Sequence, residues 1–254
     1  MVLGQMKTLM STPAGLDAIV DLALRDPIAR SRQILGPNAE RLWLRRADDR
    51  PQLFKWKNER LRHEFDSELR GLHTLTDAGM PVPDLLSEGP SHFVVSDAGI
   101  SLAHLLVRLE AVPGKRTTAF RAAGAALGRL HRSGFALGRP TIGNICWDGD
   151  EARFTEVGRL SSGQSSGRKT AFDLIVFVHS FMTKTGRAGP DLDWAMRAYR
   201  TAAPEKTWAN LQAAARWIAP LSYLAAALGW LGAKYPELRA VPKTVAYLRM
   251  ALAA

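Results

Sequence analysis

The chain has 254 residues, 46% of them apolar, which is enough for one domain or a two-lobed unit with a substantial core. A formal net charge of +10 and a pI of about 10.2 favour anionic partners such as nucleic acid, a membrane surface or a phosphorylated substrate. One cysteine, Cys146, excludes an internal disulfide and a cysteine-rich metal site, and no zinc-finger, RNP or basic-zipper pattern is present.

The first predicted elements are a helix and two strands. Gly15–Arg25 has the pattern of a short amphipathic helix, which Pro27 ends. Ser31–Leu35 and Arg41–Arg45 alternate in strand fashion around a Gly-Pro-Asn turn. The opening residues contain no uninterrupted apolar run, so a secretory signal is not expected.

A third strand and a long helix are predicted next. Gln52–Lys57 alternates as a strand does, and Lys55 follows an apolar residue on the same face. Glu59–Ala78 has apolar residues at helical spacing, with Glu64 and Glu68 one turn apart. The lysine also suits an exposed strand edge, and the glutamates also suit a solvated helix face.

The helix is expected to end at Gly79, because the two prolines that follow force extended backbone. Leu85–Gly89 and His92–Ser96 are predicted as the next strand pair. A short connector, Ser96-Asp97-Ala98-Gly99, then leads to a helix at Ser101–Leu109.

The most informative stretch of the sequence spans residues 130–158. Ala119–His131 has helical spacing, and a polar loop rich in Gly and Pro follows it. Asn144–Trp147 and Ala152–Val157 predict a hairpin closed by Asp148-Gly149. The return strand runs into Glu156-Val157-Gly158.

This layout resembles the catalytic loop and metal-binding turn of protein kinases, H-R-D-x-x-x-x-N and D-F-G. The runs GMPVPDLL, HFVVSDAGISLAHLL, LGRLHRSGFALGRPTIGNICWDG and AFDLIVFVHSF are similar in order and spacing to small atypical bacterial kinases. These are the lipopolysaccharide-core (Kdo and heptose) kinases and the relatives of the KEOPS-complex kinase subunit. The resemblance covers residues 42–181.

The resemblance implies an α+β, two-lobed protein-kinase-like fold, with a small antiparallel-sheet N-lobe and a larger helical C-lobe. We expect an N-terminal helical extension at residues 1–30, the N-lobe at 31–98 and the C-lobe at 99–254. Ser161–Lys169 is expected as a polar loop in the place of an activation segment. Further C-lobe helices are predicted at Ala171–Met182, Trp194–Tyr199, Trp208–Trp217, Leu221–Leu231 and Val241–Leu252.

The resemblance also implies site residues and cofactors. Lys55 would clamp nucleotide phosphates with Glu68 orienting it, and the connector at Ser96 and Ala98 would hold adenine through backbone groups. Asn144 and Glu156 would bind Mg²⁺, which favours oxygen ligands. ATP and Mg²⁺ are therefore the expected cofactors, and Lys55, Glu68, Asn144 and Glu156 are expected to converge.

The sequence departs from kinases at Arg139, which stands at the position of the catalytic Asp. Arginine cannot act as a general base because its pKa stays above about 12. Asp148 or Asp150 is an alternative base, and the Arg139 guanidinium itself suits a phosphate or an anionic substrate. Asp173 either braces the catalytic loop, as in the family, or is a simple charge near a helix N-terminus.

These observations leave two main readings of function open. The first is an atypical kinase that transfers phosphate from ATP to a lipid, saccharide or protein hydroxyl at an anionic surface. The second is a pseudokinase that binds nucleotide weakly or not at all and recruits a protein partner. A basic nucleic-acid-binding protein is a third class.

The expected location follows from the apolar stretch at Ile218–Ala233, which we predict as a buried helix because it is short of a membrane span. Trp208, Trp217 and Trp230 are predicted as core residues. The protein is thus expected in the cytoplasm or peripheral at the inner membrane, where an anionic lipid or a lipopolysaccharide precursor would be the partner. The sequence leaves the phosphate acceptor and the oligomeric state open.

Overall fold

The structure is a computed structural model, and it describes residues 15–25, 30–47, 55–108, 113–163, 166–214 and 236–253. The side chains of residues 55–58, 113, 166–167 and 253 fall outside this description. The chain divides into two compact units. The first comprises Met1–Leu69 and Pro83–Asp97, and the second comprises Arg70–Val82 and Ala98–Ala254.

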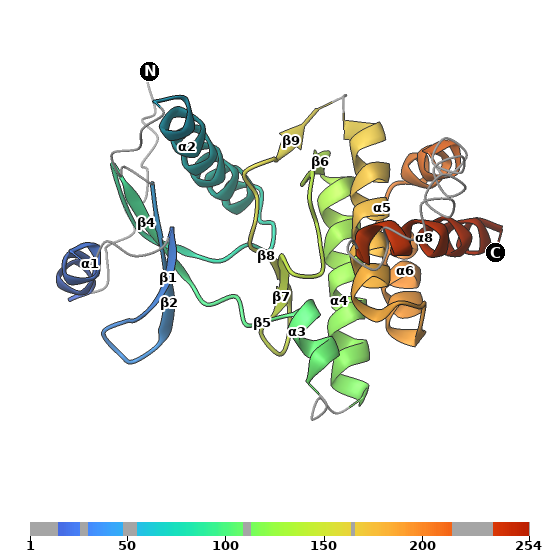
Figure 1. The fold of residues 1–254 in the computed structure, drawn as a ribbon, viewed down its shortest axis with the longest axis horizontal. Helices are drawn as coiled ribbons and strands as arrows, with labels where there is room; N and C mark the ends of the chain where they lie inside the picture. The colour runs from blue at the N-terminus through green and yellow to red at the C-terminus, as the bar shows by residue number, and fades with distance from the viewer. Residues whose placement is uncertain are drawn as a thin grey trace, which may run out of the picture. The chain divides into compact units, whose positions relative to one another are not determined.

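The first unit is built on a four-stranded antiparallel sheet with the strand order β1-β2-β4-β3 (Figure 1). Its strands are β1 (Ser31–Leu35), β2 (Arg41–Arg46), β3 (Leu85–Gly89) and β4 (His92–Ser96). All four strands lie where the alternation of apolar and polar residues predicts them, with differences of one residue or less.

Helices cover both faces of this sheet. In β2, the side chains of Leu42 and Leu44 are buried on one face, where they form a core cluster with Leu16 and Val20 of helix α1 (Leu16–Leu24). On the opposite face, Phe93 of β4 packs against Phe65 of helix α2 (Lys55–Asp77), with ring centroids 5.3 Å apart. The predicted N-terminal helix is therefore part of the core of the first unit.

Helix α2 spans Lys55–Asp77, so the strand predicted at Gln52–Lys57 is wrong for residues 55–57. Residues 52–54 lie outside the described ranges. The run from Lys55 to Arg62 consists largely of Lys, Arg, Glu and Leu, which favour helix. Six alternating residues are too few to outweigh that preference when a long helical pattern follows directly.

The end of α2 is set by local backbone chemistry, as predicted. Gly79 has a left-handed φ of 65°. The amide of Gly79 donates to the Thr76 carbonyl at 2.9 Å, and the amide of Met80 donates to the Leu75 carbonyl at 2.8 Å. This pair of bonds is the Schellman motif, which favours glycine at its left-handed position.

The second unit is mainly helical. Its helices are α3 (Leu102–Val107), α4 (Pro113–Arg132), α5 (Ser166–Thr185), α6 (Pro190–Ala202), a helix at residues 205–214, and α8 (Pro236–Ala253). Its short strands are β5 (Ile100–Ser101), β6 (Phe135–Ala136), β7 (Ile145–Trp147), β8 (Ala152–Phe154) and β9 (Ser161–Ser162). The polar loop expected at Ser161–Lys169 is wrong in part, because β9 and the first turn of α5 occupy it.

Close helix packing organises the second unit. Gly124 and Gly128 of α4 face α6, and a Cβ added at Gly124 would overlap the carbonyl oxygen of Ala195. A Cβ added at Gly128 would lie 2.7 Å from the Cβ of Ala202. These two glycines let the helix backbones approach and bury the apolar residues between them.

The predicted fold class is confirmed, because a small antiparallel sheet in one unit accompanies a larger, mainly helical unit. None of the helices in the described ranges is both long and apolar enough to cross a membrane. The helix predicted at Ile218–Ala233 lies outside the described residues, as do Trp217 and Trp230. Trp208, which the sequence predicts as a core residue, is partly buried.

Candidate functional site

The candidate site lies in the second unit, where a hairpin brings together the two predicted metal ligands. Asn144 directly precedes β7, and Glu156 lies two residues after β8. The two strands pair Ile145 with Phe154, and the amide of Thr155 donates to the carbonyl of Asn144 at 3.0 Å. The hairpin register therefore sets Asn144 beside Glu156.

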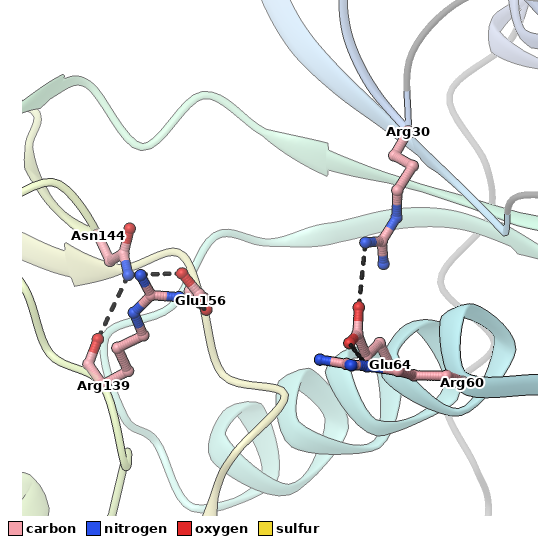
Figure 2. A network of polar contacts seen from close by, with 6 residues as sticks. All are labelled: Arg30, Arg60, Glu64, Arg139, Asn144 and Glu156. Atoms are coloured by element: carbon pink, nitrogen blue, oxygen red, sulfur yellow. Dashed lines mark hydrogen bonds and ion pairs between the residues drawn. The ribbon is translucent and has the colours of Figure 1, made fainter. Parts of the chain in front are cut away.

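Arg139, Asn144 and Glu156 form one polar group, here called the exposed trio (Figure 2). Asn144 Nδ2 donates to Glu156 Oε2 at 2.5 Å and to the Arg139 carbonyl oxygen at 3.3 Å. Arg139 Nη1 lies 3.8 Å from Glu156 Oε1. The side chains of Arg139 and Glu156 are 54% and 40% exposed, so a dissolved anion or cation can reach them.

Asp173 of α5 anchors the loop that carries Arg139 through hydrogen bonds to the loop backbone. The Asp173 carboxylate is fully buried and accepts hydrogen bonds from the amides of Leu137 at 2.6 Å and Gly138 at 2.8 Å. Gly138 has a left-handed φ of 79°. Of the two hypotheses for Asp173, the structure supports the brace, because the hydrogen bonds that these two amides donate to its carboxylate fix the backbone next to Arg139.

Two residues that sequence reasoning did not select complete this anchor. His131 Nε2 lies 3.3 Å from Asp173 Oδ2, and His131 Nδ1 lies 2.7 Å from the hydroxyl of Tyr199. Burial, together with the nearby charge of Asp173, raises the pKa of Tyr199 well above its usual value. We call His131, Asp173 and Tyr199 the buried cluster. The signal in the sequence was a His on the apolar face of a predicted helix.

The alternative bases have other roles or stay unassigned. Asp148 Oδ1 accepts hydrogen bonds from the amides of Asp150 and Glu151, both at 2.9 Å, and Asp148 Oδ2 accepts from Arg153 Nε at 3.1 Å. Burial alone would raise the pKa of Asp148, but these bonds outweigh it and the pKa lies below its usual value. Asp148 thus closes the hairpin turn, and Asp150 is exposed in that turn.

The other predicted site residues lie mostly in the first unit. Glu68 of α2 forms an ion pair with Arg45 of β2 at 3.7 Å. Ser96 Oγ accepts from the amide of Asp84 at 2.8 Å and lies 3.2 Å from Asp84 Oδ2. The side chain of Lys55 lies outside the described side chains.

Ala98 belongs to the second unit and is buried. Because Lys55 and Glu68 belong to one unit and Asn144 and Glu156 to the other, their convergence stays a prediction.

The connector contains a residue that the sequence left without a role. Asp97 accepts a hydrogen bond from Trp43 Nε1 at 3.2 Å, and its carboxylate lies 2.9 Å from Arg41 Nη2. Both partners come from β2. The last residue of the first unit is therefore tied to the middle of the sheet.

Two side chains of the exposed trio offer oxygen atoms, the type of ligand that a hard cation prefers. The Asn144 amide oxygen and the Glu156 carboxylate are the oxygen ligands that Mg²⁺ takes in proteins. In the described part of the chain, no group of three or more His, Cys, Asp or Glu side chains is arranged to hold a metal. A cation here would therefore have to take further ligands from water or from substrate phosphates, as Mg²⁺ commonly does.

A scan against protein-family models finds no matching model, and no curated protein matches the chain. Among solved structures, the chain is similar to a high-resolution crystal structure of WbdD, with 16% identity and a TM-score of 0.41, over 74% of this chain and 48% of the other. It is also similar to the bifunctional kinase-methyltransferase WbdD, with 14% identity and a TM-score of 0.41, over 74% and 49%. For a crystal structure of monomeric WbdD the identity is 17% and the TM-score is 0.46, over 69% of this chain and 47% of the other. The chain thus spans about half the length of these proteins.

Proposed function

We propose that this chain is an ATP-binding, kinase-like protein that transfers a phosphoryl group to a hydroxyl of a lipid, a saccharide or a protein. The observation that supports it most is the exposed trio: Arg139, on a loop that the buried Asp173 fixes, meets Asn144 and Glu156 of the adjoining hairpin. Phosphoryl transfer requires mainly that phosphates are positioned and their charge is neutralised. A fixed, solvent-accessible group of one cation and two oxygen-bearing side chains is suited to that task.

In this proposal Arg139 binds the phosphates. Its guanidinium is always charged and presents a planar fork that matches a phosphate group. It is more than half exposed and rests against Glu156, so a phosphate can approach it without first unfolding the loop. The absence of a carboxylate base at this position costs roughly 10²–10⁴-fold in rate, which predicts slow turnover.

Asn144 and Glu156 would hold Mg²⁺, which when bound neutralises phosphate charge. In the structure Asn144 turns its Nδ2 toward Glu156, so its amide must rotate to offer the oxygen. Arg139 must also leave Glu156. Phosphates provide an alternative partner for Arg139, and nucleotide and metal are therefore expected to bind more tightly together than separately.

A pseudokinase that works through a partner is the second candidate, and the ion pair between Arg139 and Glu156 favours it. A guanidinium already balances the charge of Glu156, which lowers its affinity for a second cation. Nucleotide would then bind to Arg139 with little or no help from Mg²⁺. Such a protein would bind ATP and release no ADP.

Nucleotide binding is tested by thermal unfolding of the full chain in the presence of ATP, of Mg²⁺ and of both. Turnover is tested by measuring the ADP that is released when water is the phosphoryl acceptor. Saturation at 100 times Kd stabilises a protein by about 2.7 kcal/mol. Arg139→Ala should weaken ATP binding by about 1.5–3 kcal/mol, the range for hydrogen bonds to charged groups. Arg139→Lys keeps the charge but loses the planar fork, so its affinity for ATP should lie between those of the parent chain and the Arg139→Ala variant.

The outcomes separate the candidates. Stabilisation by ATP with ADP release supports the kinase. Stabilisation by ATP that Mg²⁺ does not strengthen, without ADP release, selects the pseudokinase. If ATP does not stabilise the chain at any Mg²⁺ concentration, the kinase proposal is wrong, and the pseudokinase stands only in the form that binds no nucleotide.

A further inference from the structure

Two tryptophan–arginine pairs lie on the surface of the second unit. The guanidinium carbon of Arg197 lies 5.4 Å from the ring centre of Trp194 on α6. That of Arg200 lies 4.9 Å from the ring centre of Trp208, in the helix at residues 205–214. Trp194 is 43% exposed, and both arginines are exposed. We call these four residues the Trp–Arg surface.

Further positive charge surrounds this surface. Lys206 is exposed two residues before Trp208, and Arg132 of α4 is exposed while it donates to carbonyl oxygens at the end of α6. Three acidic side chains lie close in sequence: Glu205 is exposed, Asp193 accepts the hydroxyl hydrogen bond of Tyr247, and Asp191 is buried in an ion pair with Arg116. Because Arg116 already balances Asp191, four basic groups stand against two other acidic ones, and the excess charge has the same sign as the net charge of +10 for the whole chain.

We infer that the Trp–Arg surface binds the headgroup region of an anionic phospholipid bilayer. Tryptophan is suited to that region because its ring is apolar while its N–H is polar, and arginine is suited to headgroup phosphates. An anionic bilayer attracts basic residues near its surface, each contributing about fivefold to binding. The charge complementarity thus selects an acidic bilayer over a neutral one.

The stacking geometry favours lipid over single-stranded nucleic acid. A base needs a free aromatic face on which to stack. In each pair a guanidinium already lies over one face of the indole ring, where a base would otherwise stack. None of these residues belongs to the exposed trio, so lipid binding does not depend on the proposed nucleotide site.

Sedimentation of the full chain with vesicles tests the inference. One set of vesicles is neutral phosphatidylcholine, and the other contains about a quarter phosphatidylglycerol. We expect binding to the anionic vesicles only, and a loss of at least tenfold for the double variant R197A/R200A, in line with about fivefold for each charge. The matched control R60A/R62A removes the same charge from the first unit and should bind as the parent chain does. R197K/R200K keeps the charges and should stay within about threefold of the parent.

Trp194→Ala separates the aromatic part of the surface from its charge. It should weaken binding to the anionic vesicles without changing how steeply that binding falls as salt is added, because the substitution removes no charge. Equal binding to neutral vesicles would overturn the inference, and so would unchanged binding of a folded R197A/R200A variant. Binding of a short single-stranded RNA that competes with the vesicles and is lost in R197A/R200A would reassign the surface to nucleic acid.

Discussion

The buried cluster and the exposed trio lie on either side of the loop that carries Arg139, and they differ in solvent exposure and in how their polar groups are paired. The buried cluster of His131, Asp173 and Tyr199 is almost fully removed from water. The exposed trio is open to solvent, and its guanidinium is held only by one long ion pair to Glu156 beside the hydrogen bonds of Asn144. An unpaired polar group is far more costly in the interior than at the surface, so the first group should carry stability. The second carries little stability and is free to exchange its partners for a ligand.

The largest expected effect is that of Asp173→Ala. The change leaves the amides of Leu137 and Gly138 and the ring of His131 without their buried acceptor. Each buried group left unsatisfied costs about 1–3 kcal/mol, and with three groups affected we expect a loss of about 3 kcal/mol or more in urea unfolding followed by circular dichroism. A loss below about 1 kcal/mol would mean that water replaces the carboxylate, and that the brace is not needed.

Tyr199→Phe should have the next largest effect. It removes the hydroxyl that lies 2.7 Å from His131 Nδ1 and leaves that nitrogen buried. The expected loss of stability is about 1–3 kcal/mol, the desolvation penalty of an unsatisfied group. Tyr247→Phe is the matched control, because its hydroxyl bond to Asp193 at 2.8 Å is only partly buried. Equal losses for the two variants would mean that full burial of the hydroxyl bond adds nothing to its contribution to stability.

Glu156→Gln tests the exposed trio. Stability should change by less than about 0.5 kcal/mol, as for an exposed polar group. Binding of ATP without metal should strengthen by about 1 kcal/mol, the energy of two unit charges roughly 4 Å apart in water, because the carboxylate no longer competes for Arg139. Titration calorimetry with and without Mg²⁺ measures both affinities. Weaker metal-free binding would show that Glu156 assists the nucleotide without a metal.

Arg139→Asp sharpens the same comparison. It restores the residue type of active kinases at this position, but Glu156 still has one methylene more than the usual Asp. A misplacement of about 1 Å can cost 10²-fold, so ADP release should stay well below about 1 s⁻¹, the low end for ordinary kinases. Turnover at that rate or above would show that Arg139 disables a complete kinase site and is not a phosphate clamp.

The smallest effect concerns pH. His179 lies on α5, as Asp173 does, and its Nδ1 is 3.2 Å from the hydroxyl of Thr244 in α8. Burial lowers the pKa of His179, although the charge of Glu237 opposes this. The unfolded chain therefore binds the proton more readily than the native one. The contribution of His179 to stability is present above the unfolded pKa of about 6.5 and declines as the pH falls below it.

His179→Gln should make the loss of stability between about pH 7 and pH 5 less steep. The free energy of unfolding, measured at several pH values in that range, checks this. An unchanged slope would mean that the pKa of His179 is the same in the folded and the unfolded chain.

The sequence by itself determined the elements that depend on local chemistry. Gly79 ends α2 because a left-handed residue is needed there, and the hairpin around Asp148-Gly149 forms where turn residues separate two short strands. That hairpin also made the meeting of Asn144 and Glu156 predictable, since only eleven residues separate them in the chain and the strand register fixes their distance. The fold class followed from the same local patterns.

Only the tertiary structure decided which long-range partners those residues take. The sequence left two roles open for Asp173, and it gave no role to Tyr199, which is 68 residues from His131 in the chain. It also did not reveal that Arg139 pairs with Glu156. Local propensities concern neighbours along the chain, whereas the partners of Asp173 and Tyr199 are set by burial, which leaves few polar groups within reach of one another.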